Sequence, residues 1–260
     1  MRTGNLKVTF PEEGNRVLTT QISNYHFAPT KENVAHLKRS GVKTKNIIKT
    51  GNTVIDSLLL TSKKVKSFTS AITDSRLTDI IQSKKKIILV TGHRRENLGN
   101  PLAQICDALL QIANKFPETT IIYPVHPNPN VNKPVYAALN NTPNIILTHP
   151  LDYPDFVLLM KHAYILLTDS GGIQEEGPSL GKPVLVLREI TERPEALKAG
   201  TVKLVGTKSK NIVQHVSALL TSKTAYQKMS LKINPYGDGN AAAKITKRIK
   251  ANAQILKKTT

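Results

Sequence analysis

The chain has 260 residues, of which 39% are hydrophobic and 21% charged, as expected for a soluble globular protein of one large or two small domains. No apolar run approaches the roughly 18 residues that span a bilayer, and the N-terminus lacks the apolar core of a signal peptide. The single cysteine, Cys106, excludes an intrachain disulfide and favours a cytoplasmic protein with an inert buried thiol.

The charge balance is strongly basic. Lysine and arginine number 37 against 18 acidic residues, a net charge of +19, so nucleic acid is the first partner to consider. Against this partner, the lysines are scattered, aromatic residues make up only 5%, and tryptophan is absent, so bases would find few stacking surfaces. No helix-turn-helix, zinc-finger or RNP-like motif is present. We expect a solvated basic surface that favours anionic substrates, with nucleic-acid binding as the alternative.

The first part of the chain contains few clear elements. Residues 1–13 show no confident strand or helix, and residues 66–84 are polar and of uncertain structure. Thr30 can cap a helix over 31–40, which Gly41 would end. The other predicted elements here are short strands within 24–30 and at 47–48, and a helix over 54–64.

Residues 86–205 alternate between apolar strands and helices. The predicted strands are 86–90, 120–125, 145–147, 163–167, 184–187 and 202–205. This βαβ pattern implies a parallel sheet with right-handed crossovers, in which ligands bind beyond the carboxyl ends of the strands. The polar clusters follow the first five strands, at 92–97, 126–130, 149–153, 168–172 and 188–193. A turn-rich segment, 234–240, then leads into a helix over 241–256.

The turn Ser170-Gly171-Gly172 joins a buried strand to a helix. Two glycines there let backbone N–H groups approach a ligand, and the positive end of the helix points at the same place, so the turn can hold a phosphate. Glu176, early in the helix, could accept hydrogen bonds from ribose hydroxyls. The alternative is a glycine-rich turn with a capping serine, because short glycine motifs often match by chance.

A set of motifs resembles the non-hydrolysing UDP-N-acetylglucosamine 2-epimerases. In family order they are RTGNL, PEEGNR, GNTVID, VTGHRREN, YPVHPNPNV, LLTDSGGIQEEGPSLGKPVLVLREITERPEA, AGTVKLVG and NPYGDGNA. The resemblance implies two Rossmann-like domains of the glycosyltransferase-B type with a UDP-sugar in the cleft between them. It also implies interconversion of UDP-N-acetylglucosamine and UDP-N-acetylmannosamine, by elimination and re-addition of UDP, without a metal or other cofactor.

The resemblance assigns substrate contacts to the second half of the chain. The Ser170-Gly171-Gly172 turn would hold the pyrophosphate, and Glu176 would bind the ribose. Arg193, in TERPEA, would face the phosphates, and the uracil would rest near Phe156.

The same resemblance assigns catalytic and regulatory roles. His93 would assist the departing or returning UDP, and Glu12 would be one catalytic carboxylate, since removal of a weakly acidic C2 proton needs a positioned base. The alternatives are a histidine that orders its own loop and a solvated carboxylate. His126, with Arg94 nearby, would match a regulatory UDP-N-acetylglucosamine contact of some bacterial members. Glu96 and Glu175 are expected to be structural or solvated, and Arg94 and Arg95 could pair with carboxylates or with phosphate.

The chain also departs from the family pattern. Only about 50 residues precede Gly51, whereas a full domain is typically about 100–150 residues. We therefore expect 1–50 to be an incomplete N-terminal domain, 51–237 the UDP-binding domain, and 238–260 a helix that crosses back to the first part. On this interpretation the family's homodimer is impaired, and the chain alone binds UDP with very weak or absent turnover.

Overall fold

The computed structural model describes residues 11–67, 75–231 and 234–259. The chain forms two compact units: unit 1 comprises residues 1–59 and 234–260, and unit 2 comprises residues 60–233. The first border therefore lies nine residues after the expected division at 50, and the second lies four residues before the expected division at 237. The reason is local to unit 1: the Asn52 N–H donates to the Tyr236 carbonyl over 2.6 Å, which joins two segments that were both expected to belong to the UDP-binding domain, 51–237.

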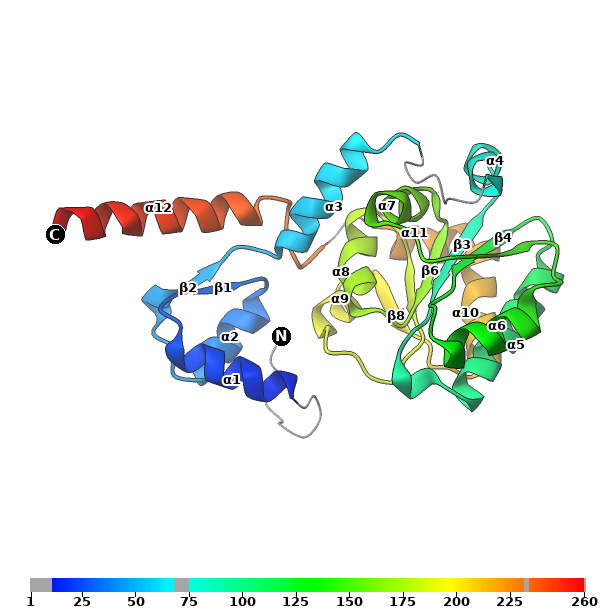
Figure 1. Ribbon diagram of the computed structural model, residues 1–260, viewed down its shortest axis with the longest axis horizontal. Helices are drawn as coiled ribbons and strands as arrows, with labels where there is room; N and C mark the ends of the chain where they lie inside the picture. Colours follow the sequence, from blue (N-terminus) through cyan, green and yellow to red (C-terminus); the bar gives the residue numbers. More distant parts are fainter. Residues whose placement is uncertain (1–10, 68–74, 232–233, 260) are drawn as a thin grey trace. The chain divides into compact units, whose positions relative to one another are not determined.

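Unit 2 contains a six-stranded sheet in which every strand pair is parallel (Figure 1). The strands are β3 (Ile87–Thr91), β4 (Thr120–Pro124), β5 (Ile145–Thr148), β6 (Ile165–Thr168), β7 (Val184–Val186) and β8 (Val202–Leu204). The helices are α4 (Arg76–Gln82), α5 (Asn100–Lys115), α6 (Pro129–Leu139), α7 (Tyr153–His162), α8 (Gly171–Ser179), α9 (Pro194–Lys198), α10 (Ser209–Thr221) and α11 (Lys223–Met229). The parallel α/β fold expected for this region is confirmed.

Strands β3 to β7 are almost wholly buried, which explains why they are mainly apolar runs, whereas β8 carries the exposed Lys203. Ile88 and Val90 of β3 face a core built with α5, α6 and α10. Helices α7 and α8 pack on the other side of the sheet, against β3, β6 and β7 (Figure 1). Cys106 of α5 lies in the first core, where burial raises the pKa of its thiol to about 11. The thiol is therefore buried and protonated, as expected.

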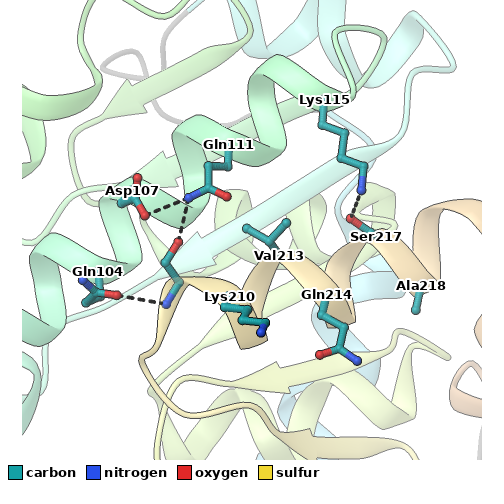
Figure 2. Close-up of a pocket in the computed structure, with 10 residues that line it drawn as sticks. Gln104, Asp107, Gln111, Lys115, Lys210, Val213, Gln214, Ser217 and Ala218 are labelled. Carbon is teal, nitrogen blue, oxygen red and sulfur yellow. Dashed lines mark hydrogen bonds between the residues drawn. The ribbon is translucent and has the colours of Figure 1, made fainter.

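Helices α5 and α10 lie side by side and frame an open groove (Figure 2). The Gln111 amide nitrogen donates to Asp107 on its own helix and to the Ser209 hydroxyl at the start of α10, over 2.9 and 3.1 Å. The Ser209 N–H in turn donates to Gln104 over 3.3 Å. These bonds anchor the first turn of α10 on α5.

The strand order is β5-β4-β3-β6-β7-β8. Successive strands are added on one side of β3 up to β5 and on its other side from β6 onward, so the order switches between β3 and β6 while the strands stay parallel. In a sheet of this kind the loops that follow the two central strands diverge and leave a crevice at their carboxyl ends. Here these are the loop from Gly92, which follows β3, and the Ser170-Gly171 turn, which follows β6. The topology therefore brings together two of the polar clusters that the sequence places at strand ends.

Unit 1 contains a two-stranded parallel sheet of β1 (His26–Ala28) and β2 (Ile47–Lys49). Its other elements are α1 (Glu12–Ile22), α2 (Lys31–Arg39), η1 (Thr44–Asn46), the start of α3 (Thr53–Lys64) and α12 (Ala241–Thr259). The Thr30 hydroxyl accepts the Asn33 N–H over 3.1 Å, so the predicted cap of α2 is confirmed. Helix α12 contacts the N-terminal segments: the Arg248 guanidinium lies 5.0 Å from the Tyr25 ring centre.

The sequence analysis missed several helices. Helix α1 begins at Glu12, inside a region for which no helix was expected, and Leu18 and Ile22 on it are largely exposed. Its sequence, EEGNRVLTTQI, contains few apolar residues, so the apolar stripe that marks an amphipathic helix is short. Helices α10 and α11 were also missed, although Ile212 and Val216 are buried at helical spacing. The motif at 2–6 lies outside the described residues.

Asp56 of α3 caps α12 from a distance of 185 residues along the chain. Its carboxylate accepts the N–H groups of Ala241 and Ala242 over 3.1 and 2.8 Å. We expect Asp56→Ala to destabilise α12 by about 1 kcal/mol, as measured by hydrogen exchange of its first amides, because two helix donors lose their acceptor. Asp238→Ala, which removes a largely exposed pair with Lys244, is the control with a smaller expected effect. Equal protection in the Asp56 variant would contradict the capping role.

Among the described residues, no helix is long and apolar enough to cross a membrane.

Candidate functional site

The N-terminus of α8 lies at the carboxyl end of β6. Ser170 precedes the helix with extended backbone angles, and its side chain makes no capping hydrogen bond. The capping-serine interpretation is therefore wrong for this structure. Because the first amides of a helix have no acceptor within the helix, they remain available to a ligand. The turn thus has the free donors and the positive helix end that an anion site needs.

Arg193 lies directly over this turn. A Cβ atom at Gly171 would overlap the Arg193 guanidinium, so only glycine allows this approach. The Arg193 Nε donates to Glu175 over 2.8 Å, and its backbone N–H donates to the Thr191 hydroxyl over 3.1 Å. Thr191 in turn donates to the buried Gln174 over 2.6 Å. The guanidinium is therefore held beside the helix terminus by residues of α8 itself.

Glu176 lies one turn into α8 and is almost fully buried. Its carboxylate accepts a hydrogen bond from the Tyr153 hydroxyl, at the start of α7, over 2.6 Å. Burial raises the pKa of Glu176; the Tyr153 hydrogen bond opposes this shift, and the charge of Glu175 adds to it. Burial and the carboxylate also raise the pKa of Tyr153 far above its ordinary value, so its hydroxyl remains a donor.

Asp169, the residue before Ser170, organises the loop that follows β3. It is completely buried, and its Oδ2 accepts hydrogen bonds from the backbone N–H groups of His93 and Arg94, over 2.9 and 2.8 Å. Its third donor is the side-chain amide of Asn97, at 3.1 Å, which also donates to the Leu187 carbonyl over 3.2 Å. The loop after β3 is therefore fixed to the ends of β6 and β7.

His93 projects from this loop with 45% of its side chain exposed. Its ring stacks on His126, with 6.0 Å between ring centres and 21° between ring planes. The exposed His126 accepts the Asn128 N–H on its Nδ1 over 3.1 Å. The structure therefore brings together two histidines that the sequence analysis placed in different roles.

The remaining residues of the predicted site fall into two groups. In unit 2, Phe156 is half-buried in the first turn of α7, and Arg94 is half-buried beside His93. Glu96 and Glu175 are paired: the first accepts from the Arg188 Nε over 2.7 Å, and the second binds Arg193.

Glu12 belongs to unit 1, where it is exposed in the first turn of α1. Its neighbour Glu13 is buried and lies 3.3 Å from the Arg16 guanidinium. Of these two carboxylates, Glu12 is the one open to a ligand.

Sequence analysis singled out neither Asp169 nor Tyr153. Asp169 had a visible signal, since it is an acidic residue directly after a buried strand. Its partners, His93 and Arg94, follow another strand, so their proximity depends on the pairing of β3 with β6. Tyr153 had no signal, because its partner Glu176 lies 23 residues away on another helix.

The raised pKa of Glu176 predicts a pH-dependent stability. A carboxyl that binds its proton more tightly in the folded state adds to the free energy of unfolding. This stabilisation is complete below the unfolded pKa of about 4.3 and is lost as pH rises through the folded pKa. We expect Glu176→Gln to abolish that loss, so the variant gains stability relative to the parent chain from about pH 4 upward. Urea unfolding across this range measures the difference, with the exposed Glu118→Gln as control. Parallel profiles for the Glu176 variant and the parent would refute the prediction.

Comparisons with known proteins agree with this architecture. A family model described as UDP-N-acetylglucosamine 2-epimerase matches residues 1–250. The UDP-N-acetylglucosamine 2-epimerase of Yersinia pestis is 51% identical over 98% of this chain and 68% of its own length. A Neisseria meningitidis UDP-GlcNAc 2-epimerase, solved with UDP-GlcNAc bound, is 43% identical with a TM-score of 0.86, covering 96% of this chain and 67% of the other.

The S. aureus protein MnaA, solved with UDP, is 40% identical with a TM-score of 0.88, covering 97% of this chain and 67% of its own. The chain thus spans about two thirds of the length of these relatives. The neighbours have the glycosyltransferase-B type of fold, which agrees with the parallel α/β architecture described above. From its sequence and from its fold, the chain belongs to the UDP-N-acetylglucosamine 2-epimerase family.

Proposed function

We propose that the chain binds a UDP-sugar through unit 2 and serves the interconversion of UDP-N-acetylglucosamine and UDP-N-acetylmannosamine. The observation that carries the proposal is the uncapped N-terminus of α8, which has Arg193 over Gly171 and Glu176 one turn further on. It lies next to the point where the strand order of the sheet switches, where ligands of such folds bind. Structures of relatives with UDP or UDP-GlcNAc bound support the same class of ligand.

In this proposal the pyrophosphate, the ribose and the uracil each contact protein groups of suitable chemistry. The pyrophosphate takes hydrogen bonds from the amides after Ser170, including that of Gly172, and its charge is balanced by Arg193. The ribose hydroxyls donate to Glu176, whose second carboxylate oxygen would lie 3.8 Å from a Cβ at Gly172 and therefore faces the turn. The uracil packs near Phe156.

The proposed reaction needs a base and help for the leaving group. Glu12, or another carboxylate, takes the C2 proton. The electrons of the C2–H bond then form the C1–C2 double bond of a glycal. The C1–O bond breaks, and its electron pair stays on the UDP oxygen. His93 donates a proton to that oxygen. Re-addition of UDP, with proton return to the other face of C2, completes the inversion.

Deuterium incorporation at C2 of UDP-N-acetylglucosamine in D₂O, followed by NMR, tests the proposal. Exchange at about 1 s⁻¹ or faster, as is typical of enzymes, would support catalysis by this chain. UDP binding without exchange would leave a UDP-binding protein without turnover, the alternative weighed from the sequence. If calorimetry detects no UDP binding, and a salt-dependent gel shift persists in the presence of UDP, the function is wrong and nucleic-acid binding replaces it.

We also propose that His126 and Arg94 contact a second, regulatory UDP-N-acetylglucosamine. The stacking of His126 on His93 supports this role, because a ligand that moves one ring displaces the other. His126→Ala should then change the dependence of turnover on UDP-N-acetylglucosamine concentration while affinity for UDP at the α8 site is kept. An unchanged dependence would exclude a regulatory role for this residue.

A further inference from the structure

Asp169 is the buried carboxylate that joins the two central loops of the site. Both the backbone of the loop after β3 and the side chain of Asn97 donate to its Oδ2. This leaves Oδ1 for one further donor. Oδ1 is inaccessible to solvent and receives no hydrogen bond of good geometry from the part of the chain that the structure describes. A buried carboxylate oxygen without a donor costs stability, so a donor is expected close by.

The nearest candidate donor is the ring of His93. Its Nδ1 lies 3.2 Å from Oδ1, and the ring is half-exposed on its other side. Catalytic hydrogen bonds are often poorly aligned in ligand-free structures and tighten when the ligand binds. A small rotation of the ring would bring an Nδ1–H onto Oδ1, because the His93 backbone is already fixed by the same carboxylate.

We propose that Asp169 is a positioning residue that holds the proton of neutral His93 on Nδ1 and leaves Nε2 as the nitrogen that faces the UDP-sugar. This inference rests on the proposed function, in which His93 assists the leaving UDP. A carboxylate at Nδ1 selects one tautomer and stabilises the doubly protonated ring from which Nε2 gives up its proton. Asp169 thereby acts on the reaction through His93, without touching the substrate.

The variant Asp169→Asn isolates this role. The asparagine oxygen can replace Oδ2 and keep the hydrogen bonds from His93, Arg94 and Asn97. Its NH₂ group then faces Nδ1, which must become an acceptor, so the ring proton moves to Nε2. The exposed Asp107→Asn, which also alters a carboxylate bonded to a side-chain amide, is the matched control.

The ring nitrogens are observed by ¹⁵N NMR of the imidazole at about pH 8.5, well above the pKa of an ordinary histidine. The signals of His93 are assigned among the 7 histidines by their loss in His93→Gln. We expect the Nδ1–H tautomer in the parent chain and in Asp107→Asn, and the Nε2–H tautomer in Asp169→Asn. An Nε2–H tautomer in the parent chain, or the same tautomer in all three, would overturn the proposal. The parent spectrum alone decides the matter if Asp169→Asn does not fold.

A functional readout separates this inference from the proposed function. In a chain that binds UDP and exchanges C2 deuterium, Asp169→Asn should lower the exchange rate about 10²–10⁴-fold, as expected when acid–base catalysis fails. Its affinity for UDP should stay within about threefold of the parent, since the α8 turn is unchanged. Equal exchange rates would overturn the positioning role. Absence of UDP binding in the parent would remove the proposed function, while the tautomer measurement would still test the Asp169–His93 pair.

Discussion

Replacing Ser170 by aspartate is expected to lower the affinity for UDP by about 10³-fold. Two unit charges 4 Å apart in a partly buried site interact by about 4 kcal/mol, and each 1.4 kcal/mol is about a factor of ten in affinity. The aspartate would stand before the open amides of α8 and both repel the pyrophosphate and compete for its donors. Isothermal titration with UDP measures the loss.

Two features make this experiment specific. Aspartate is a favourable N-cap, so the variant should fold at least as well as the parent, and lost affinity cannot be ascribed to unfolding. Ser170→Ala is the control: because the Ser170 hydroxyl makes no capping bond, its removal should cost only about tenfold or less. Equal affinity of Ser170→Asp and the parent would remove the pyrophosphate from this turn.

Gly177→Ala is expected to cost about 2 kcal/mol of unfolding free energy through overpacking. A Cβ atom there would lie 2.5 Å from a Val184 methyl carbon and 2.8 Å from a Leu166 methyl carbon, both in buried strands. The steric cost must exceed the roughly 1 kcal/mol that alanine gains over glycine inside a helix. The change in unfolding free energy is measured by urea unfolding of the whole chain, in which the loss of the six-stranded parallel sheet is followed.

Gly172→Ala provides the matched control in the same helix. The nearest atoms to a Cβ there belong to Ser170 and Glu176, at 3.7 and 3.8 Å, which is ordinary contact. This variant should lose no stability, although it can weaken UDP binding. If both variants are equally stable, α8 can move away from the sheet, and close packing at Gly177 does not fix the position of α8.

The sequence analysis succeeded where structure depends on neighbouring residues. Strands β3 to β7 are mainly apolar on both faces, so each is visible as a short apolar run, and the Ser170-Gly171-Gly172 turn marks the start of α8. Their parallel pairing follows from the alternation with helices. The sequence therefore predicts that the loops after β3 and β6 lie at one edge of the sheet, as the structure shows.

The same approach could not identify contacts between distant segments. The roles of Asp169 and Tyr153 come from pairings across 76 and 23 residues, which no local pattern contains. Helix α1 shows a different limit: it carries few apolar residues, and two of them, Leu18 and Ile22, are largely exposed, so core packing did not require a long apolar stripe in its sequence. Its start depends on Pro11 and on two acidic residues in the first turn.

The bond between Asn52 and Tyr236, with the Asp56 cap of α12, has a consequence for the order of folding. Unit 2 is an insertion within unit 1, whose two chain segments are separated by residues 60–233. During synthesis the ribosome completes the inserted unit before the returning segment exists, and domains generally fold as they emerge. The N-terminal segment of unit 1 therefore waits for its C-terminal partner, and α12 completes unit 1 only after the six-stranded sheet of unit 2 has formed.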